Sequence, residues 1–333
     1  MREAADQAGI LVGAAVRPAR FAESAYSVTL AREFNMLGLE DAMKWQEVHP
    51  VPDAYDFRAG DTVLRYAQAH GMKVRGHCLV WDHSNPDWLA QGAFTSSRLS
   101  QFMHQHISAV VKHYAGQVFA WDVVNEALDE NGRLKDSIWY NQPGIGAGKD
   151  AAYIVQAFRW AREADPKALL FYNENGGEGL NRKSDAIYIM VKDLKNRGVP
   201  IDGVGLQMHI SRLDYDTNAV AANIARLTAL GLQVHITELD VSLPVDANGV
   251  ASPEDLQRQA AVYRGVVHAC LESPGCTAIQ TWGFTDKWSW IGSHSHHTRG
   301  AALPFDRMYQ PKAAYDAILE ELASSKRGVH RAY

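Results

Sequence analysis

The sequence lacks any long hydrophobic run, since none reaches the roughly 18 apolar residues that a membrane-spanning helix needs. It also lacks an excess of positive charge, because 38 Asp and Glu residues outnumber 33 Lys and Arg residues and give a formal net charge of −5. Nucleic-acid binding depends on a basic surface. We therefore expect neither a membrane nor a nucleic acid as the partner of this chain.

Cysteine is scarce, with three residues in a chain of 333. Cys78 lies in the apolar run RGHCLVW, whereas Cys270 and Cys276 flank a segment that contains ESPG. A tight turn there could bring the two Cα atoms within the roughly 7 Å that a disulfide requires. We predict a Cys270–Cys276 disulfide, which would indicate an oxidising compartment; two reduced thiols are the alternative.

The first 16 residues lack the longer apolar region and the small-residue cleavage site of a secretory signal peptide. We interpret the apolar part of this stretch as a first buried strand. The starting Met does not settle whether a leader was removed, so the missing signal does not by itself predict a cytoplasmic protein.

A glycine-rich phosphate turn is absent after the first apolar run, which continues into Val16-Arg17-Pro18-Ala19, and no Walker-type loop occurs. Both absences disfavour a doubly wound nucleotide-binding sheet. Eight near-continuously apolar runs alternate instead with helix-like segments, as expected for parallel strands buried on both faces. The alternation predicts an α/β fold, a (β/α)8 TIM barrel forming a single domain over residues 1–333. The predicted strands are 10–16, 36–40, 73–81, 120–126, 168–174, 204–209, 233–240 and 278–284.

Polar and aromatic residues are frequent at the carboxyl ends of these predicted strands, where barrel active sites lie. An isolated Glu or His would more often be structural, but residues from seven strand ends would converge on one cleft. Glu126 and Glu238 end the fourth and seventh strands, whose tips can face each other across a barrel mouth. Glycoside cleavage needs one carboxylic acid to protonate the leaving oxygen and one carboxylate on the other face of the sugar. Metal ligation is a rival reading, disfavoured because no HxxxH or HxH spacing lies near them.

Six motifs carry a resemblance to a known family: EDAMKW, RGHCLVW, WDVVNEAL, GLQMHI, VHITELDV and QTWGFTDKWSW. In this order, and on these strands, they resemble glycoside hydrolase family 10, the retaining endo-β-1,4-xylanases. The resemblance covers essentially the whole chain. It implies hydrolysis of internal β-1,4-xylosidic bonds of xylan or xylo-oligosaccharides by double displacement, without a cofactor or metal.

The resemblance also implies roles for individual residues. Glu238 corresponds to the nucleophile and Glu126 to the general acid/base, and Asn125 would bond the 2-hydroxyl of the sugar. His209 would hydrogen-bond the nucleophile and be held by Asp240. The other implied positions are His77, Asn173 and Gln207 lining the pocket, Glu40, Lys44 and Trp81 gripping the glycone side, and Trp282 and Trp290 roofing and walling the cleavage subsite.

Two opposite protonation states are required of the paired carboxyls. We expect a negative neighbour to raise the pKa of Glu126, and a hydrogen bond from His209 to favour ionised Glu238.

Three positions depart from the family pattern, which has Asn at 41, His at 82 and Gln at 84. Here they are Asp41, Asp82 and Ser84, and we expect all three on the glycone side. Ordinary xylanase activity is one interpretation. The alternative is altered glycone specificity for a decorated or different sugar.

The loop 293–299 is rich in His, with His294, His296 and His297. Its spacing matches no zinc pattern, so we interpret it as a polar loop at the barrel mouth, from which Arg299 reaches the cleft. Two rival functions stay open: a retaining glycosidase for another β-glycan or glycoside, and a non-catalytic barrel that binds polysaccharide. We expect a monomer, and a secreted or periplasmic location because xylan does not cross membranes.

Overall fold

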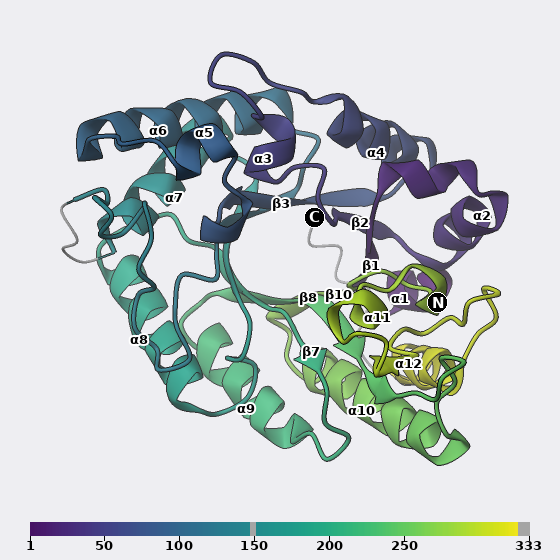
Figure 1. The fold of residues 1–333 in the computed structure, drawn as a ribbon. Helices are drawn as coiled ribbons and strands as arrows, with labels where there is room; N and C mark the ends of the chain where they lie inside the picture. Colours follow the sequence, from purple (N-terminus) through teal and green to yellow (C-terminus); the bar gives the residue numbers. More distant parts are fainter. Residues whose placement is uncertain (147–150, 326–333) are drawn as a thin grey trace.

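The structure is a computed structural model that describes residues 1–146 and 151–325. Within them, eight parallel strands form a ring in the order β10-β1-β2-β3-β4-β5-β6-β8, and pairing of β10 with β8 closes it. Figure 1 shows the strands surrounding the centre with the long helices outside them. The predicted TIM barrel is therefore confirmed. The strands are β1 (Leu11–Val16), β2 (Met36–Leu39), β3 (Lys73–Val80), β4 (Ala120–Asn125), β5 (Leu169–Glu174), β6 (Gly203–Leu206), β8 (Gln233–Val241) and β10 (Cys276–Thr281).

Long helices cover the outside of the strands, and shorter helices and strands lie in the loops (Figure 1). The longer helices are α2 (Ser24–Glu33), α4 (Arg58–Ala69), α6 (Ser96–His113), α7 (Ala152–Ala164), α8 (Arg182–Asn196), α9 (Thr217–Thr228), α10 (Pro253–Leu271) and α12 (Ala313–Ser324). The shorter elements are α1 (Arg2–Gln7), α3 (Trp45–Val48), α5 (Asp87–Ala90), α11 (Ile291–His294), the 3-10 helices Pro18–Ala22, Asp82–Ser84 and Asp286–Trp288, and the strands β7 (His209–Ile210), β9 (Leu243–Pro244) and β11 (Arg299–Gly300).

The structure divides the predicted sixth strand, residues 204–209, into two separate strands. Met208 has a φ of 69°, a left-handed conformation that interrupts the extended chain. The strand therefore ends at Leu206, and His209 begins the separate strand β7, where it pairs with Asp240 of β8. The interruption sets His209 beside the end of β8.

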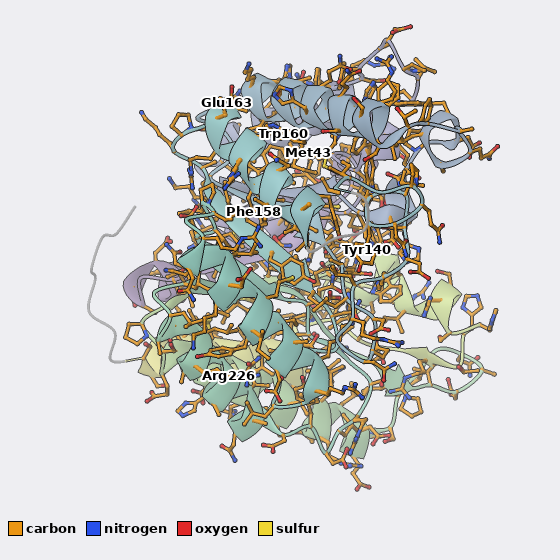
Figure 2. All side chains as sticks on the ribbon, turned by 90° about the vertical axis from the view of Figure 1, so that its left-hand side faces the viewer. Met43, Tyr140, Phe158, Trp160, Glu163 and Arg226 are labelled. Carbon is orange, nitrogen blue, oxygen red and sulfur yellow. A yellow bond between two sulfur atoms is a disulfide. The ribbon has the colours of Figure 1, made fainter. Side chains whose placement is uncertain are left out.

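Burial follows the expected pattern of a barrel, because strand residues are buried on both faces and helix residues on one. Every residue of β1, β4 and β6 is buried. On α7, Phe158 is buried, Glu163 is exposed, and Trp160 packs against His104 of α6 with ring centroids 4.9 Å apart. Figure 2 views the molecule from this helical side.

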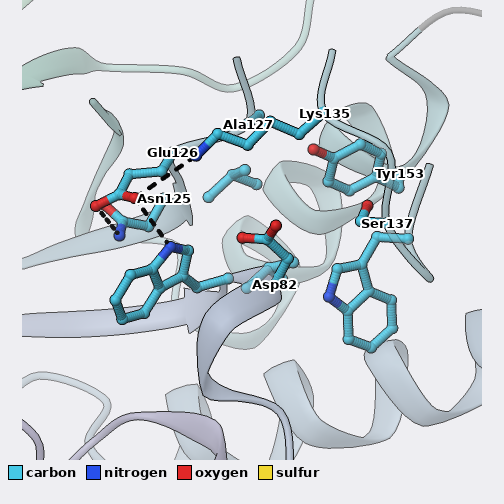
Figure 3. Close-up of a pocket in the computed structure, with 11 residues that line it drawn as sticks. Asp82, Asn125, Glu126, Ala127, Lys135, Ser137 and Tyr153 are labelled. Carbon is cyan, nitrogen blue, oxygen red and sulfur yellow. Dashed lines mark hydrogen bonds and ion pairs between the residues drawn. The ribbon is translucent and has the colours of Figure 1, made fainter. Parts of the chain in front are cut away.

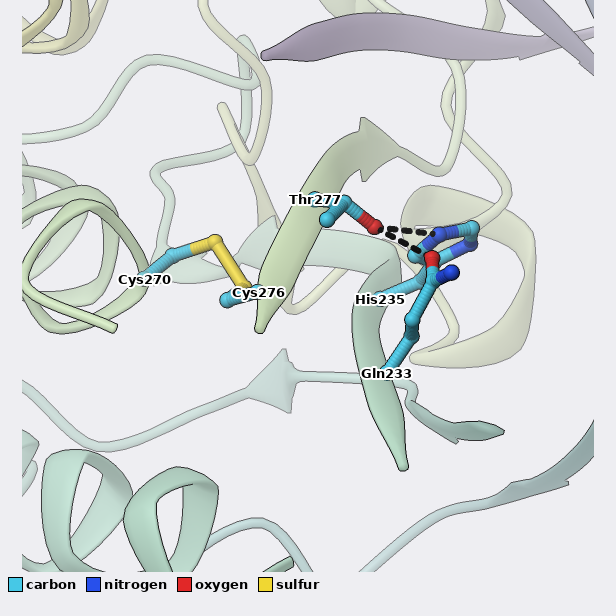
Figure 4. Close-up of a disulfide and its surroundings, with 5 residues drawn as sticks. All are labelled: Gln233, His235, Cys270, Cys276 and Thr277. Atoms are coloured by element: carbon cyan, nitrogen blue, oxygen red, sulfur yellow. Dashed lines mark hydrogen bonds between the residues drawn. A yellow bond between two sulfur atoms is a disulfide. The ribbon is translucent and has the colours of Figure 1, made fainter. Parts of the chain in front are cut away.

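The disulfide predicted between Cys270 and Cys276 is present, with Cα atoms 5.2 Å apart. It joins the end of α10 to the first residue of β10 (Figure 4). Cys78 is free and buried. In the described part of the chain, no helix is long and apolar enough to cross a membrane.

Candidate active site

Glu126 follows the last residue of β4 and has a φ of 54°. A non-glycine residue in this left-handed region carries backbone strain, which is characteristic of functional sites. Its backbone N–H donates to the carbonyl oxygen of Asn173 at 2.9 Å, which fixes the turn against β5. The turn places the carboxyl group at the mouth of the barrel.

Three side-chain amides connect Glu126 to Glu238. The Nδ2 of Asn173 donates to Oε1 of Glu238 and to Oδ1 of Asn125, both at 2.8 Å. The Nε2 of Gln207 donates to the same Asn125 oxygen at 3.2 Å and to Oε1 of Glu126 at 3.0 Å. The two carboxylates therefore belong to one hydrogen-bonded pocket, as the sequence predicts.

Asn173 reaches this position because β6 has no side chain opposite it. A Cβ at Gly205 would lie 2.1 Å from Oδ1 of Asn173 and 3.0 Å from Cγ2 of Thr237. The hydroxyl of Thr237 donates to the same Asn173 oxygen at 2.7 Å, so the amide is oriented with its N–H groups toward the carboxylate. Position 205 therefore requires glycine, because the Asn173 side chain lies too close to leave room for a Cβ.

His209 bridges the two acids of β8. Its Nε2 lies 3.1 Å from Oε2 of Glu238, and its Nδ1 lies 3.0 Å from Oδ2 of Asp240. Burial opposes protonation of the ring, but the charge and hydrogen bond of Asp240, together with Glu238, raise the pKa of His209 well above its ordinary value. Trp290 also donates from Nε1 to Oδ2 of Asp240 at 2.8 Å. The charged imidazole favours ionised Glu238.

The expected raised pKa of Glu126 is wrong for the free protein. Burial favours the neutral acid, but the hydrogen bond from Gln207 and the positive charges of Lys135, His77 and His83 outweigh it, so the pKa of Glu126 lies below its ordinary value. Lys135 is 3.7 Å from Oε2 of Glu126. A negative neighbour alone would raise this pKa, but the fold also brings these donors and cations close to Glu126.

His77 lies beneath the pocket in a buried polar cluster. Its Nδ1 lies 3.0 Å from Oδ2 of Asp122, whose other oxygen accepts a hydrogen bond from the buried Arg75. Its ring lies edge-on to Trp282, with centroids 5.2 Å apart. His77 therefore packs against Trp282 and also places a positive charge near Glu126.

Two indoles and a lysine form one wall of the pocket. Trp81 donates from Nε1 to Oε2 of Glu126 at 3.3 Å. The Nζ of Lys44 lies 5.2 Å from the ring centroid of Trp81 and 5.9 Å from that of Trp282. The wall thus combines flat apolar faces with one cation, a combination suited to a polar ligand with apolar faces.

Glu40 lies behind this wall in a buried ion-pair cluster. One of its oxygens accepts from Nε of Arg17 at 2.7 Å, and Arg20 contacts both of its oxygens. Asp41 pairs with Nη2 of Arg17 at 2.7 Å and with Nζ of Lys44 at 2.9 Å. Although burial opposes it, these two cations lower the pKa of Asp41. Both oxygens of Glu40 bind arginine, and its expected part in gripping the glycone side stays a prediction.

Asp82 and Ser84 are the first and last residues of the 3-10 helix that follows β3. Asp82 lines a small pocket next to Glu126 and Lys135, which Figure 3 shows together with Ser137 and Tyr153. Ser84 is 3% exposed in the 3-10 helix that follows β3. The expected glycone-side placement of Asp82 and Ser84 stays a prediction.

Arg299 does not reach the catalytic pair. Its Nε donates to Oγ of Ser242 at 3.0 Å and its Nη2 to the carbonyl oxygen of Ser211 at 2.8 Å. These bonds tie the His-rich loop to the ends of β7 and β8, which makes Arg299 a structural tie. Within residues 1–146 and 151–325, no cluster of three His, Cys, Asp or Glu side chains has the arrangement of a metal site.

Sequence reasoning missed Arg17, Lys135 and the role of Glu174. Arg17 directly follows β1, so the strand-end rule applied to the other strands would have found it. Lys135 lies in the loop after β4, where no local signal marks it. Glu174 is fully buried and accepts from the backbone N–H of Leu128 at 3.0 Å, which anchors the chain just after Glu126.

The buried position of Glu174 also changes its protonation. Its pKa is raised to about 7, because burial outweighs the charge of Lys183 at 3.3 Å and the hydrogen bond from Tyr172 at 2.6 Å.

The chain is similar to known proteins over most of its length. The model of glycosyl hydrolase family 10 matches residues 1–321. Endo-1,4-beta-xylanase B from Thermotoga neapolitana is 41% identical over 295 residues, which span 89% of this chain and 82% of that protein. Xylanase 10B from Thermotoga petrophila RKU-1, solved in complex with xylobiose, has a TM-score of 0.91 at 40% identity and covers 96% of each chain.

A third relative is described as an intracellular xylanase from Thermoanaerobacterium saccharolyticum JW/SL-YS485. It has a TM-score of 0.86 at 36% identity, with 95% of this chain and 97% of that chain covered. The family match, these similarities and the barrel with its two linked carboxylates lead to one conclusion: the chain belongs to glycosyl hydrolase family 10.

Proposed function

We propose that this protein is an endo-1,4-β-xylanase that hydrolyses internal β-1,4-xylosidic bonds of xylan and xylo-oligosaccharides with retention of anomeric configuration. The observation that supports it best is the connection of Glu126 and Glu238 through the shared amides of Asn125, Asn173 and Gln207. Retaining hydrolysis needs two carboxyl groups on opposite faces of one anomeric carbon. Family membership supports the same reaction.

The first step forms a covalent intermediate. A carboxylate oxygen of Glu238 attacks the anomeric carbon while the carboxyl proton of Glu126 passes to the glycosidic oxygen, whose bond to that carbon breaks. The aglycone leaves as an alcohol and Glu126 is left ionised. In the second step Glu126 takes a proton from water, the hydroxide oxygen attacks the same carbon, and Glu238 is released as a carboxylate.

The neighbouring residues prepare both acids for these steps. Protonated His209, held by Asp240, keeps Glu238 ionised and oriented. Asn125 bonds the 2-hydroxyl of the sugar as positive charge develops on the ring, so it contributes more to the transition state than to ground-state binding. Bound substrate covers the pocket and excludes water from Glu126. This desolvation raises the pKa of Glu126 and favours its protonated form.

The sugar on the glycone side packs against Trp81, Trp282 and Trp290, with Lys44 directed at its hydroxyl groups. Indole faces provide apolar contact for the C–H faces of the sugar, and the cation fixes the orientation of its hydroxyls. Asp41 acts through Lys44, which it holds at 2.9 Å.

The decisive experiment is turnover of an aryl β-xylobioside, with the anomeric configuration of the first product followed by NMR. We expect a β product and a loss of at least about 10³-fold in kcat for Glu238→Ala, with azide restoring release as the inverted glycosyl azide. Turnover confined to another β-glycan would favour the first rival function. Binding of xylan without any turnover would favour the non-catalytic barrel.

We also propose that the protein works as a monomer in an oxidising compartment, secreted or periplasmic. The Cys270–Cys276 disulfide and a polymeric substrate support this location. One relative is described as intracellular, so family membership alone does not determine the location of this protein. Fractionation of the native host, and size-exclusion chromatography of the purified protein, test the two points.

A further inference from the structure

Arg17 lies at the carboxyl end of β1 and is the outermost member of a chain of ion pairs that starts at the pocket. Lys44 faces Trp81 and Trp282, Asp41 binds Lys44, and Arg17 binds Asp41. Side-chain exposure rises in the same order, from 12% for Lys44 to 31% for Asp41 and 51% for Arg17. Arg17 therefore stands at the rim of the cleft, next to the residues proposed to hold the glycone.

The cluster presents hydrogen-bond donors to the cleft. Glu40 is 5% exposed and both of its oxygens bind Arg17 or Arg20. Asp41 is engaged by Arg17 and Lys44 in the same way. Arg17 uses Nε and Nη2 in these contacts, and among the described residues nothing binds its Nη1. Since guanidinium only donates, the outward face of the cluster suits a ligand that accepts.

The charges around Arg17 balance. The ion-pair cluster and the adjoining rim around Trp288 hold four cations and three carboxylates, and the exposed Glu47 adds a fourth negative charge that acts on Arg17. The cations are Arg17, Arg20, Lys44 and Lys287, and the carboxylates are Glu23, Glu40 and Asp41. Arg20 and Lys287 both lie against the 40% exposed Trp288, at 5.5 and 5.4 Å from its ring centroid. An exposed aromatic face beside guanidinium and ammonium donors suits a sugar ring that carries hydrogen-bond acceptors.

We propose that Arg17 is a specificity-determining residue that binds the carboxylate of an acidic sugar, a uronic acid branch, on the glycone side of the cleaved bond. A carboxylate is the ligand group that matches the guanidinium fork, and its two oxygens accept from donors that a neutral hydroxyl would only partly satisfy. The inference rests on the proposed xylanase function. It specifies the substrate as acidic xylan and assigns a cause to one family departure, Asp41, which anchors Arg17.

The test compares xylotetraose carrying one glucuronic acid branch with the same oligosaccharide after its carboxyl group is reduced to an alcohol. We expect the wild-type protein to cleave the acidic form with a kcat/KM about fivefold higher, the size of effect typical of a partly exposed ion pair. The branch should remain on the fragment that carries the new reducing end. High salt should lower the ratio, because exposed charges are screened.

Two variants and one control assign the effect to Arg17. Arg17→Gln should bring the acidic-to-reduced ratio to about 1, and Arg17→Lys should give an intermediate ratio because it keeps the charge without the fork. Arg197→Gln removes a comparable exposed Arg–Asp pair just past the end of α8, at the opposite end of the barrel, and should leave the ratio unchanged. If Arg17→Gln does not fold, the proposal still requires that Arg17→Lys has a lower acidic-to-reduced ratio than the wild-type protein.

Three results would overturn the proposal: a ratio near 1 in the wild-type protein, an unchanged ratio in the Arg17 variants, or a branch found on the other product. Unbranched xylotetraose keeps this outcome separate from the proposed function. If the wild-type protein leaves it uncleaved, the xylanase assignment fails. The acidic subsite is then tested by calorimetric binding of the two branched oligosaccharides to Glu238→Ala, where equal affinities would refute it.

Discussion

Lys135 Nζ lies 3.7 Å from Oε2 of Glu126, and the pair places a positive charge beside the acid that must carry a proton. Among the groups that lower the pKa of Glu126, Lys135 follows only the hydrogen bond from Gln207, while burial acts in the opposite direction. The contact therefore favours the ionised form in the free protein, which suits the second chemical step more than the first.

Replacement of this lysine should widen the active pH range. In Lys135→Met the pKa of Glu126 rises, so the alkaline limb of kcat/KM, which reports the free enzyme, should move up by about half a pH unit. The pH–rate profile on an aryl β-xylobioside measures it. Lys195→Met, at the end of α8, is the matched control and should show the wild-type limb. A limb that moves down would contradict the assigned electrostatics.

Gly205 should tolerate no side chain, because a Cβ there would lie 2.1 Å from Oδ1 of Asn173. We expect Gly205→Ala to push the Asn173 amide away from Glu238 and to reduce kcat by about 10²-fold, a cost typical of a misplacement near 1 Å. Steady-state kinetics with a thermal melt separates this from unfolding. Gly300→Ala, whose Cβ would meet Val245 at an ordinary 3.5 Å, is the control. Full activity in Gly205→Ala would show that Asn173 does not position the carboxylate.

Glu174 should make stability depend on pH. Its pKa of about 7 in the folded protein lies above the ordinary value of 4.5, so between these values the folded state binds more protons than the unfolded state. The free energy of unfolding should therefore fall as pH rises from 4.5 to 7, by on the order of 1–3 kcal/mol from this group. Urea denaturation at pH 5 and pH 8 tests it. Glu174→Gln should lose this part of the slope, and an unchanged slope would contradict the assignment.

The disulfide should stabilise the end of α10 modestly. Closing so short a loop restricts the unfolded chain little, and the loop-entropy relation gives about 2 kcal/mol. The double variant Cys270→Ala/Cys276→Ala should lose about that much unfolding free energy and keep wild-type kcat, since the bond lies where the chain enters β10 from below the barrel. Chemical denaturation and kinetics measure the two effects. A large loss of kcat would indicate that the bond also supports the site.

Much of the fold was predictable because parallel strands buried on both faces leave apolar runs that alternate with helical periodicity. All eight predicted strands are present within a few residues. The split at Met208 was not predictable, since its left-handed conformation depends on the contacts of the chain around it. The disulfide was predictable because six residues of sequence separation limit how far apart its cysteines can lie.

The sequence by itself determined which residues stand at the strand ends, and hence that Glu126, Glu238 and their amide and imidazole partners would meet in one cleft. Only the tertiary structure decided that Glu40 is buried between arginines, that Asp82 turns toward Glu126, and that Lys135 and Gln207 lower the pKa of that acid. The reason is physical. Strand-end positions follow from local periodicity, whereas ion pairing, burial and pKa depend on distances between side chains that are far apart in the sequence.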